Sequence, residues 1–158
     1  MSDTTPAVVP AERPRRHFLP IGILAIATLG LWFWTSRPVE TLVPWQRDLA
    51  AAQEQARDQN RLILLEFDSL NCGYCKLMDG EVFSRPEVVP LLENFIPVRL
   101  DMNRFQSEAR RFGVRGVPAF YVLTPAGEVI DSREGASSFQ DFSRFLIAIQ
   151  AEFRSNAT

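Results

Sequence analysis

The sequence has 158 residues but only two cysteines and a single histidine. Cys72 and Cys75 are three positions apart, so a disulfide between them closes almost no loop and adds little stability. The alternative for such a pair is half of a zinc site, which needs two further Cys or His ligands, and the chain offers only His17. A c-type haem attachment needs a histidine directly after the second cysteine, where Lys76 stands. The scarcity of ligands therefore favours redox chemistry at the pair and predicts neither a metal nor another cofactor.

The sequence also lacks a strong charge of either sign. It contains 17 basic and 19 acidic residues, a net charge of −2, and no basic cluster occurs beyond residue 36. Without a basic patch, this part of the chain has no concentration of positive charge to attract the phosphates of nucleic acid, so we expect no nucleic-acid partner. Hydrophobic residues make up 46% of the chain, which suits a folded core, and the length suits one domain.

One long stretch near the N-terminus lacks charge altogether. Residues 18–34 contain no charged side chain, and three arginines and a histidine precede them. A helix of this length rises about 25 Å at roughly 1.5 Å per residue, at the short end of what crosses a bilayer. Because basic residues prefer the cytoplasmic side, the rest of the chain should lie across the membrane. The predicted organisation is a cytoplasmic tail over 1–17, a transmembrane anchor over 18–36, a linker over 37–44 and one domain over 45–158.

Three other interpretations of the N-terminal segment stay open. A cleaved signal peptide has the same basic and apolar parts, although Arg37 and Pro38 stand where a peptidase prefers small residues. The pair Arg15 and Arg16 resembles the twin-arginine export motif. A buried core helix of a soluble protein is the weakest alternative, because the segment has no polar face.

The remaining chain alternates helical and strand patterns. The run at 61–68 is largely apolar, with Leu62–Leu65 unbroken, and of strand length, which is typical of a central strand buried on both faces. Helical patterns are expected over residues 45–60, 75–83, 86–94, 104–112 and 139–153, and strands over 61–68, 95–101, 119–124 and 128–133. This order predicts an α/β fold, with a mixed four-stranded sheet and helices on both of its faces.

The cysteine pair directly follows the first buried strand and opens a helix. Unpaired backbone N–H groups and the macrodipole at a helix start favour a thiolate, so Cys72 should have a lowered pKa and act as the nucleophile. Cys75 lies one turn further on and can attack the mixed disulfide to release the product.

Two motifs together resemble the thioredoxin superfamily. The first is Cys-Gly-Tyr-Cys-Lys at residues 72–76, and the second is Phe-Gly-Val-Arg-Gly-Val-Pro-Ala-Phe at 112–120. The resemblance covers residues 45–153 and implies the thioredoxin fold. Together with the stretch Glu-Val-Phe-Ser-Arg-Pro-Glu-Val at 81–88, it is most similar to membrane-anchored periplasmic thioredoxin-like proteins related to the C-terminal domain of the bacterial transmembrane thiol reductant conductor.

The resemblance assigns roles to several residues around the cysteines. Pro118 would be the cis-proline that faces them, and Val117 would pair its backbone with an extended substrate polypeptide, beside Gly73 and Tyr74. An ordinary trans-proline ahead of a strand is the alternative, since cis X–Pro bonds are a minority state.

Glu66 lies six residues before Cys72, where thioredoxins keep a buried acid. A buried carboxylate has a raised pKa and could take the proton from Cys75 as it attacks. The alternative is that Glu66 merely pairs with Lys76 or Arg61 at the edge of the sheet.

The chain also departs from the thioredoxin pattern, and these departures leave the direction of exchange open. Asn71 replaces the usual tryptophan, the dipeptide Gly73-Tyr74 is that of periplasmic disulfide isomerases, and Gly80 replaces a helix-kinking proline but could still permit a bend.

Three functions follow from this resemblance. The first is a reductase or exchange enzyme on the inner membrane, with its catalytic domain in the periplasm, supplied by a membrane electron donor and acting on disulfides of envelope proteins. The second is an oxidant that donates its disulfide. The third is a redox-sensing binding or chaperone module.

Overall fold

A computed structural model describes residues 26–32 and 40–156. The chain divides into two units, Met1–Pro38 and Val39–Thr158. In the first unit, residues 26–32 are helical and exposed to solvent. Within the described parts of the chain, no helix combines the length and the apolar character that crossing a membrane requires. Most of the predicted anchor, 18–36, lies outside the described residues, so the anchor stays a prediction.

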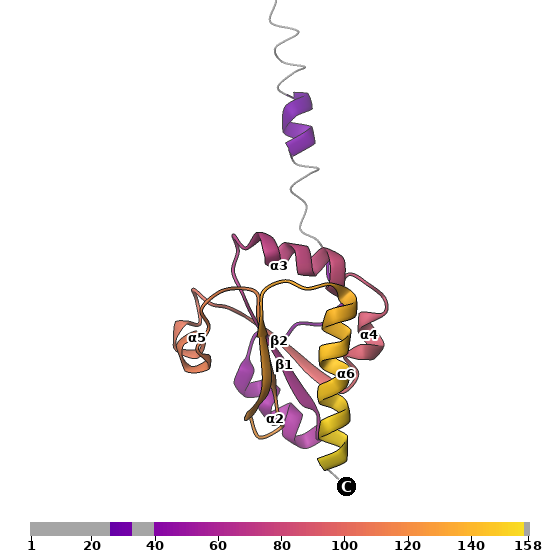
Figure 1. The fold of residues 1–158 in the computed structure, drawn as a ribbon. Helices are drawn as coiled ribbons and strands as arrows, with labels where there is room; N and C mark the ends of the chain where they lie inside the picture. Colours follow the sequence, from indigo (N-terminus) through magenta and orange to yellow (C-terminus); the bar gives the residue numbers. More distant parts are fainter. Residues whose placement is uncertain (1–25, 33–39, 157–158) are drawn as a thin grey trace, which may run out of the picture. The chain divides into compact units, whose positions relative to one another are not determined.

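The second unit contains the predicted α/β domain (Figure 1). Its elements in chain order are α2 (Leu49–Gln59), β1 (Leu62–Asp68), α3 (Gly73–Met78), the π-helical turn η1 (Asp79–Phe83), α4 (Val88–Leu91), β2 (Phe95–Asp101), α5 (Gln106–Phe112), β3 (Ala119–Leu123), β4 (Val129–Glu134) and α6 (Phe139–Asn156). The predicted order of elements is therefore confirmed.

The four strands form one mixed sheet in the order β2-β1-β3-β4. β1 runs parallel to β2 and antiparallel to β3, and β4 pairs with β3 as the outer strand of a hairpin. β1 is buried on both faces from Leu62 to Phe67, as its apolar run predicts. The register places Glu66 of β1 directly beside Arg99 of β2.

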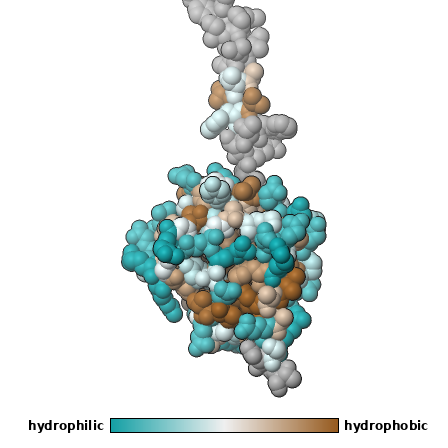
Figure 2. Space-filling view, viewed as in Figure 1, coloured by the Kyte–Doolittle hydropathy of each residue, from teal (hydrophilic) through white to brown (hydrophobic). Residues whose placement is uncertain are grey.

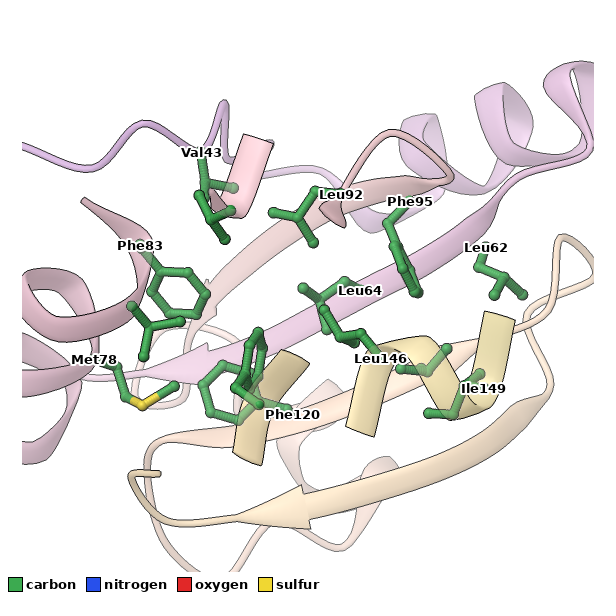
Figure 3. Packing of buried hydrophobic residues seen from close by; sticks show 14 residues of the cluster. Val43, Leu62, Leu64, Met78, Phe83, Leu92, Phe95, Phe120, Leu146 and Ile149 are labelled. Carbon is green, nitrogen blue, oxygen red and sulfur yellow. The ribbon is translucent and has the colours of Figure 1, made fainter. Parts of the chain in front are cut away.

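Each face of the sheet carries its own hydrophobic cluster. One face is covered by α2 and α5, whose alanines Ala52, Ala56 and Ala109 allow a close approach to the strands. The other face is covered by α4 and α6, and Figure 3 shows side chains of this second cluster packed between the sheet and α6. Figure 2 shows a hydrophobic region over α6 and the neighbouring edge of the sheet.

The helix that follows the cysteines is bent by a π-helical turn. α3 ends at Met78 and η1 continues from Asp79 to Phe83, with Gly80 inside the turn. A π turn adds one residue to the helical repeat and re-aims the residues that follow it. Asp79, the first residue of the turn, reaches back to Arg99 of β2.

The segment ahead of α2 packs against the domain. The backbone N–H of Leu42 donates to the carbonyl of Phe83 at 2.8 Å, Val43 is buried, and Gln46 forms a parallel bridge with Val98 of β2. The described end of the predicted linker, from residue 40 onwards, thus leads directly into the fold.

Candidate active site

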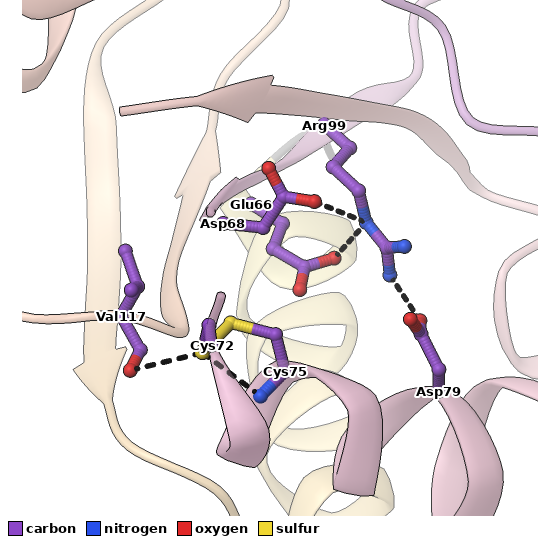
Figure 4. Close-up of a disulfide and its surroundings, with 7 residues drawn as sticks. All are labelled: Glu66, Asp68, Cys72, Cys75, Asp79, Arg99 and Val117. Carbon is purple, nitrogen blue, oxygen red and sulfur yellow. Dashed lines mark hydrogen bonds and ion pairs between the residues drawn. A yellow bond between two sulfur atoms is a disulfide. The ribbon is translucent and has the colours of Figure 1, made fainter. Parts of the chain in front are cut away.

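Cys72 and Cys75 form a disulfide at the start of α3, with their Cα atoms 5.2 Å apart (Figure 4). The pair follows the carboxyl end of β1 after a short loop at residues 69–71, so the central strand of the sheet fixes its position. A bond between neighbouring turns of one helix start can open and close without unfolding the domain, because it restrains so short a loop.

The two sulfurs differ in their hydrogen bonding. Cys72 is the N-cap of α3, and its Sγ accepts the backbone N–H of Cys75 at 3.0 Å. A donor of this kind at a helix N-terminus favours negative charge on the sulfur that accepts it. Exposure does not separate the two cysteines, because Cys72 is 8% and Cys75 5% exposed. The predicted difference in thiolate stability between Cys72 and Cys75 therefore rests on hydrogen bonding and the helix dipole, and not on exposure.

The residues between the cysteines are open to solvent. Gly73 is exposed, and the side chain of Tyr74 is 67% exposed. Both therefore lie on the surface next to the disulfide, and their predicted contact with a substrate stays a prediction.

The peptide bond between Val117 and Pro118 is cis, as the motif at 112–120 predicts. The carbonyl oxygen of Val117 lies 3.5 Å from Sγ of Cys72. In the described parts of the chain, neither backbone polar group of Val117 takes part in a backbone hydrogen bond. An extended segment of another polypeptide could pair with these groups beside the reacting sulfur.

Glu66 is completely buried in β1, and its partner is Arg99 of the neighbouring strand. The Nε–H of Arg99 donates to Oε2 of Glu66 at 2.7 Å. Oε1 of Glu66 is buried and has no hydrogen-bond partner among the described residues. Figure 4 shows Glu66 between Arg99 and the cysteine pair, with its second oxygen on the side of the disulfide.

The alternative pairing considered for Glu66 is wrong. Lys76 is exposed on α3, and Arg61 instead donates to the carbonyl of Phe95 and to Gln59 at the opposite end of the strand. Position 66 lies in the middle of the sheet, where the side chains that can reach it come from the neighbouring strands.

Arg99 holds together a cluster of three carboxylates. Besides Glu66, its guanidinium donates to Oδ1 of Asp79 at 2.7 Å and lies 3.9 Å from Oδ2 of Asp68. Its Cζ lies over the ring of Trp45, 4.4 Å from the ring centroid. Arg99 is only 6% exposed, so these contacts replace nearly all of its hydration.

Burial dominates the titration of this cluster. Desolvation raises the pKa of Glu66 from 4.5 to about 8, and Arg99 offsets only part of that effect. Desolvation also raises the pKa of Asp68. Burial would lower the pKa of Arg99, but the charges of Glu66 and Asp79 outweigh it and keep the guanidinium positive. The domain thus holds beside its disulfide a carboxyl group that can change protonation near neutral pH.

Arg99 and Asp79 were not identified from the sequence as site residues. An arginine flanked by apolar residues inside the strand Phe-Ile-Pro-Val-Arg-Leu-Asp was the available signal for Arg99, because a buried cation requires an anion nearby. For Asp79 there was none, because its contact with Arg99 joins the helix to the sheet and has no local sequence pattern.

The fold and the motif agree with the comparisons to known proteins. A family model described as thioredoxin-like matches residues 44–125, which is more than half of the chain. The chain belongs to the thioredoxin-like family. Its family and its cysteine pair make it a thiol–disulfide oxidoreductase.

One curated relative is the thiol:disulfide interchange protein DsbD of Pseudomonas fluorescens. The two are 30% identical over 97 residues, which are 59% of this chain and 17% of DsbD. The chain therefore spans less than a fifth of the length of that relative.

Two solved structures have a similar fold. A thioredoxin from Thermus thermophilus aligns with a TM-score of 0.62 at 28% identity, over 71% of this chain and 91% of that one. The C-terminal domain of DsbD from Neisseria meningitidis, in its oxidised form, aligns with a TM-score of 0.55 at 22% identity, over 64% and 95% of the two chains. The resemblance to thioredoxins and to DsbD, which the sequence predicts, is confirmed.

Proposed function

We propose that this protein reduces or exchanges disulfides in proteins of the bacterial cell envelope. Cys72 is the attacking thiolate, and Cys75 is the resolving thiol. The observation that carries the proposal is the hydrogen bond from the Cys75 N–H to Sγ of Cys72, because it stabilises negative charge on one sulfur of the pair and not on the other.

The reaction takes two exchanges. The Cys72 thiolate attacks one sulfur of a substrate disulfide, forms a mixed disulfide and releases the first substrate thiolate. Cys75 then loses its proton and attacks Cys72, which releases the second substrate thiolate and leaves the Cys72–Cys75 disulfide. The substrate gains two electrons and the enzyme loses two, so a donor must reduce the enzyme after each turnover. We propose that a membrane protein supplies these electrons.

Glu66 is the proposed acceptor of the proton from Cys75. A pKa of about 8 lies close to the ordinary value of a thiol, about 8.5, so the transfer needs little driving force. The buried and unpaired Oε1 supports this role. Arg99, which is itself bonded to Asp79, holds the other oxygen of the Glu66 carboxylate and keeps it in place.

Val117 and Pro118 are proposed to hold the substrate. The free backbone groups of Val117 would pair with an extended segment around the substrate cysteine, and Gly73 and Tyr74 would lie against it. The location proposed for this reaction is the periplasmic side of the inner membrane, with residues 18–36 as the anchor, because of the uncharged run and the basic residues before it.

Trapping of the mixed disulfide tests these cysteine roles. Cys75→Ser should accumulate a covalent complex of Cys72 with its protein partner, since the resolving sulfur is gone, whereas Cys72→Ser should trap little. Equal trapping by the two variants would contradict the assignment. Reduced protein should also react with iodoacetamide at Cys72 well before Cys75 near pH 7.

The reduction potential of the pair decides between a reductant and the alternative oxidant. A value of about −270 mV is typical of a reductase, and one of about −120 mV is typical of a disulfide donor. A pair that exchanges with neither type of partner protein would instead favour the redox-sensing module.

A further inference from the structure

Glu66 has no contact of its own with solvent, although it must pass on any proton that it takes from Cys75. Its exposed fraction is zero. Its second oxygen lies on the side of the disulfide, where Cys72 and Cys75 are only 8% and 5% exposed (Figure 4). A proton that reaches Glu66 from this side therefore needs another way out before the carboxylate can act again.

Direct release of this proton is slow. An acid with a pKa of about 8 gives its proton to water no faster than roughly 10² per second, because diffusion limits its recapture to about 10¹⁰ M⁻¹s⁻¹. Dissolved buffer removes that limit for an exposed acid, but it cannot touch a side chain without exposed surface. The buried acid needs a neighbour that buffer and water can reach.

Asp68 is such a neighbour. It lies two positions after Glu66 on β1, so the two side chains project from the same face of the sheet. Both approach one nitrogen of Arg99, whose Nε lies 2.7 Å from Oε2 of Glu66 and 3.9 Å from Oδ2 of Asp68. Figure 4 shows the two contacts meeting at that nitrogen. The side chain of Asp68 is 21% exposed, so it connects the buried acid with the surface.

Asp79 is also partly exposed, but it contacts a different atom of the arginine. Its Oδ1 accepts from Nη2 of Arg99 at 2.7 Å, whereas Glu66 and Asp68 share Nε, and its side chain is 18% exposed. The guanidinium between them stays positive and passes no proton. Asp79 therefore has the same charge as Asp68 and a similar exposure without sharing a nitrogen with Glu66.

The charges around Asp68 suit a group that holds a proton briefly. Burial has the largest effect on its pKa and raises it, Arg99 and Arg47 lower it, and Asp101 and Asp79 raise it. The pKa of Asp68 therefore lies above its ordinary value. This rise brings its proton affinity closer to that of the buried acid, and a smaller difference makes transfer between the two carboxylates easier.

We propose that Asp68 relays the proton of Glu66 to solvent, and that this relay limits the resolving step at the pH where Glu66 is largely protonated. The inference rests on the proposed role of Glu66. Cys75 gives its proton to Glu66 as its sulfur attacks Cys72. Glu66 gives that proton to Asp68 and becomes a carboxylate again, and Asp68 gives it to water or buffer. Each transfer moves one proton and no electrons.

The resolving step of two matched variants tests the relay. Asp68→Asn keeps the shape of the side chain but not the carboxylate, and Asp79→Asn makes the same change at the other contact of Arg99. The full-length reduced protein in detergent is mixed at pH 7 with an excess of a peptide whose cysteine is joined to 2-nitro-5-thiobenzoate. Release of coloured nitrothiobenzoate measures the attack by Cys72, and mass spectrometry of acid-quenched samples follows the loss of the mixed disulfide.

In a bulky buffer, Asp68→Asn should resolve the mixed disulfide about ten-fold more slowly than the wild type. Added imidazole, a small base that can approach a partly buried site, should restore most of that rate. The wild type and Asp79→Asn should hardly respond to imidazole, and Asp68→Glu, which keeps a carboxylate, should resolve at close to the wild-type rate. Similar rates of nitrothiobenzoate release in all variants would show that the fold and Cys72 are intact.

The sign of the change separates a relay from an effect of charge. The charges of Asp68 and Asp79 both raise the pKa of Glu66, so removal of either charge lowers that pKa. More Glu66 is then deprotonated at pH 7, and resolution becomes faster. Loss of the relay makes it slower, and this is expected of Asp68→Asn alone.

Two results would overturn the relay and leave the role of Glu66 standing. The first is an Asp68→Asn variant that resolves as fast as Asp79→Asn, and the second is a slow Asp68→Asn variant that imidazole does not restore. A separate measurement tests the role of Glu66 itself. If Glu66→Gln resolves the mixed disulfide at the wild-type rate at pH 8, Glu66 accepts no proton from Cys75, and the proposed acceptor and its relay are both wrong.

Discussion

Arg99 and Glu66 face each other across β2 and β1, with 2.7 Å between Nε of the arginine and Oε2 of the glutamate. The same guanidinium reaches Asp79, which lies seven residues after Cys72 on the bent helix. The pairing therefore connects the buried acid of the sheet to the helix that carries the cysteines. A substitution of Glu66, Arg99 or Asp79 should therefore alter the reactivity of the cysteine pair.

The first prediction concerns stability against pH. Glu66 has a raised pKa in the folded protein, so between pH 4.5 and about 8 the folded state keeps a proton that the unfolded state releases. The free energy of unfolding should therefore fall as pH rises through this window, by an amount on the order of several kcal/mol, and stay level above it. Urea unfolding from pH 5 to 9 measures it. Glu66→Gln should remove most of this slope and leave only the part due to Asp68, whose pKa burial also raises. Parallel curves for the two proteins would contradict the assignment.

The second prediction concerns the resolving step. Glu66→Gln cannot accept a proton, so release of a preformed Cys72 mixed disulfide should slow by about 10²-fold near pH 8, where a large share of wild-type Glu66 is deprotonated. The rate should recover as the pH approaches that at which Cys75 ionises unaided. Stopped-flow measurement of peptide release provides the rate. An unchanged rate and pH profile would leave Glu66 with a structural role only.

The third prediction separates charge from geometry at Arg99. Arg99→Met leaves three carboxylates without their cation, so the protein should lose about 3–5 kcal/mol of stability and the pKa of Glu66 should rise further. The pH at which resolution becomes fast should then move upwards. Arg99→Lys keeps the charge but loses the planar guanidinium that bonds Glu66 and Asp79 together. We therefore expect the pH profile of resolution to shift by an intermediate amount. If both variants resolve with the wild-type pH profile, Arg99 only stabilises the fold.

The fourth prediction is a shift of the Glu66 pKa in the opposite direction, caused by removing the charge of Asp79. Asp79 raises the pKa of Glu66 by its charge and also occupies part of Arg99. Asp79→Asn should lower the pKa of Glu66, so the pH profile of the resolving step should move downwards. Asp141→Asn removes an exposed carboxylate that pairs with Arg144 on α6, and it serves as the control that leaves the profile in place. An upward shift in Asp79→Asn would contradict this electrostatic account.

The fifth prediction concerns topology. An enzyme that is active only in the periplasm should work when fused after Thr158, and the protein should stay with membranes after a carbonate wash. Both results follow from the uncharged run at 18–34 and the arginines before it. Recovery of a shortened protein in the soluble fraction would favour the cleaved signal peptide.

The sequence allowed the sheet and the cysteine pair to be predicted because both depend on local patterns. The apolar run of β1 and the strand at 95–101 were placed with nearly their observed bounds, since a buried strand must be apolar on both faces. The position of Cys72 at a helix start followed from the strand before it.

The partner of Glu66 could not be predicted in the same way. Its pairing with Arg99 depends on the register between two strands that lie 33 residues apart, and a shift of one residue would have turned Arg99 to the other face. Lys76 and Arg61 were nearer in the sequence, but distance along the chain says little about distance across a sheet. The contact of Asp79 with Arg99 joins the helix to the sheet, and no local pattern predicts it either.

The segment before α2 also affects how copies of this protein behave beside one another. β2 is an edge strand, and such edges invite pairing with strands of other molecules. Here Gln46 accepts the N–H of Arg99 and donates its own to the carbonyl of Pro97, at 2.9 Å each. Pro97 itself has no N–H to offer. The middle of this edge therefore presents no free hydrogen-bonding groups, and crowded molecules cannot add strands to each other there and aggregate.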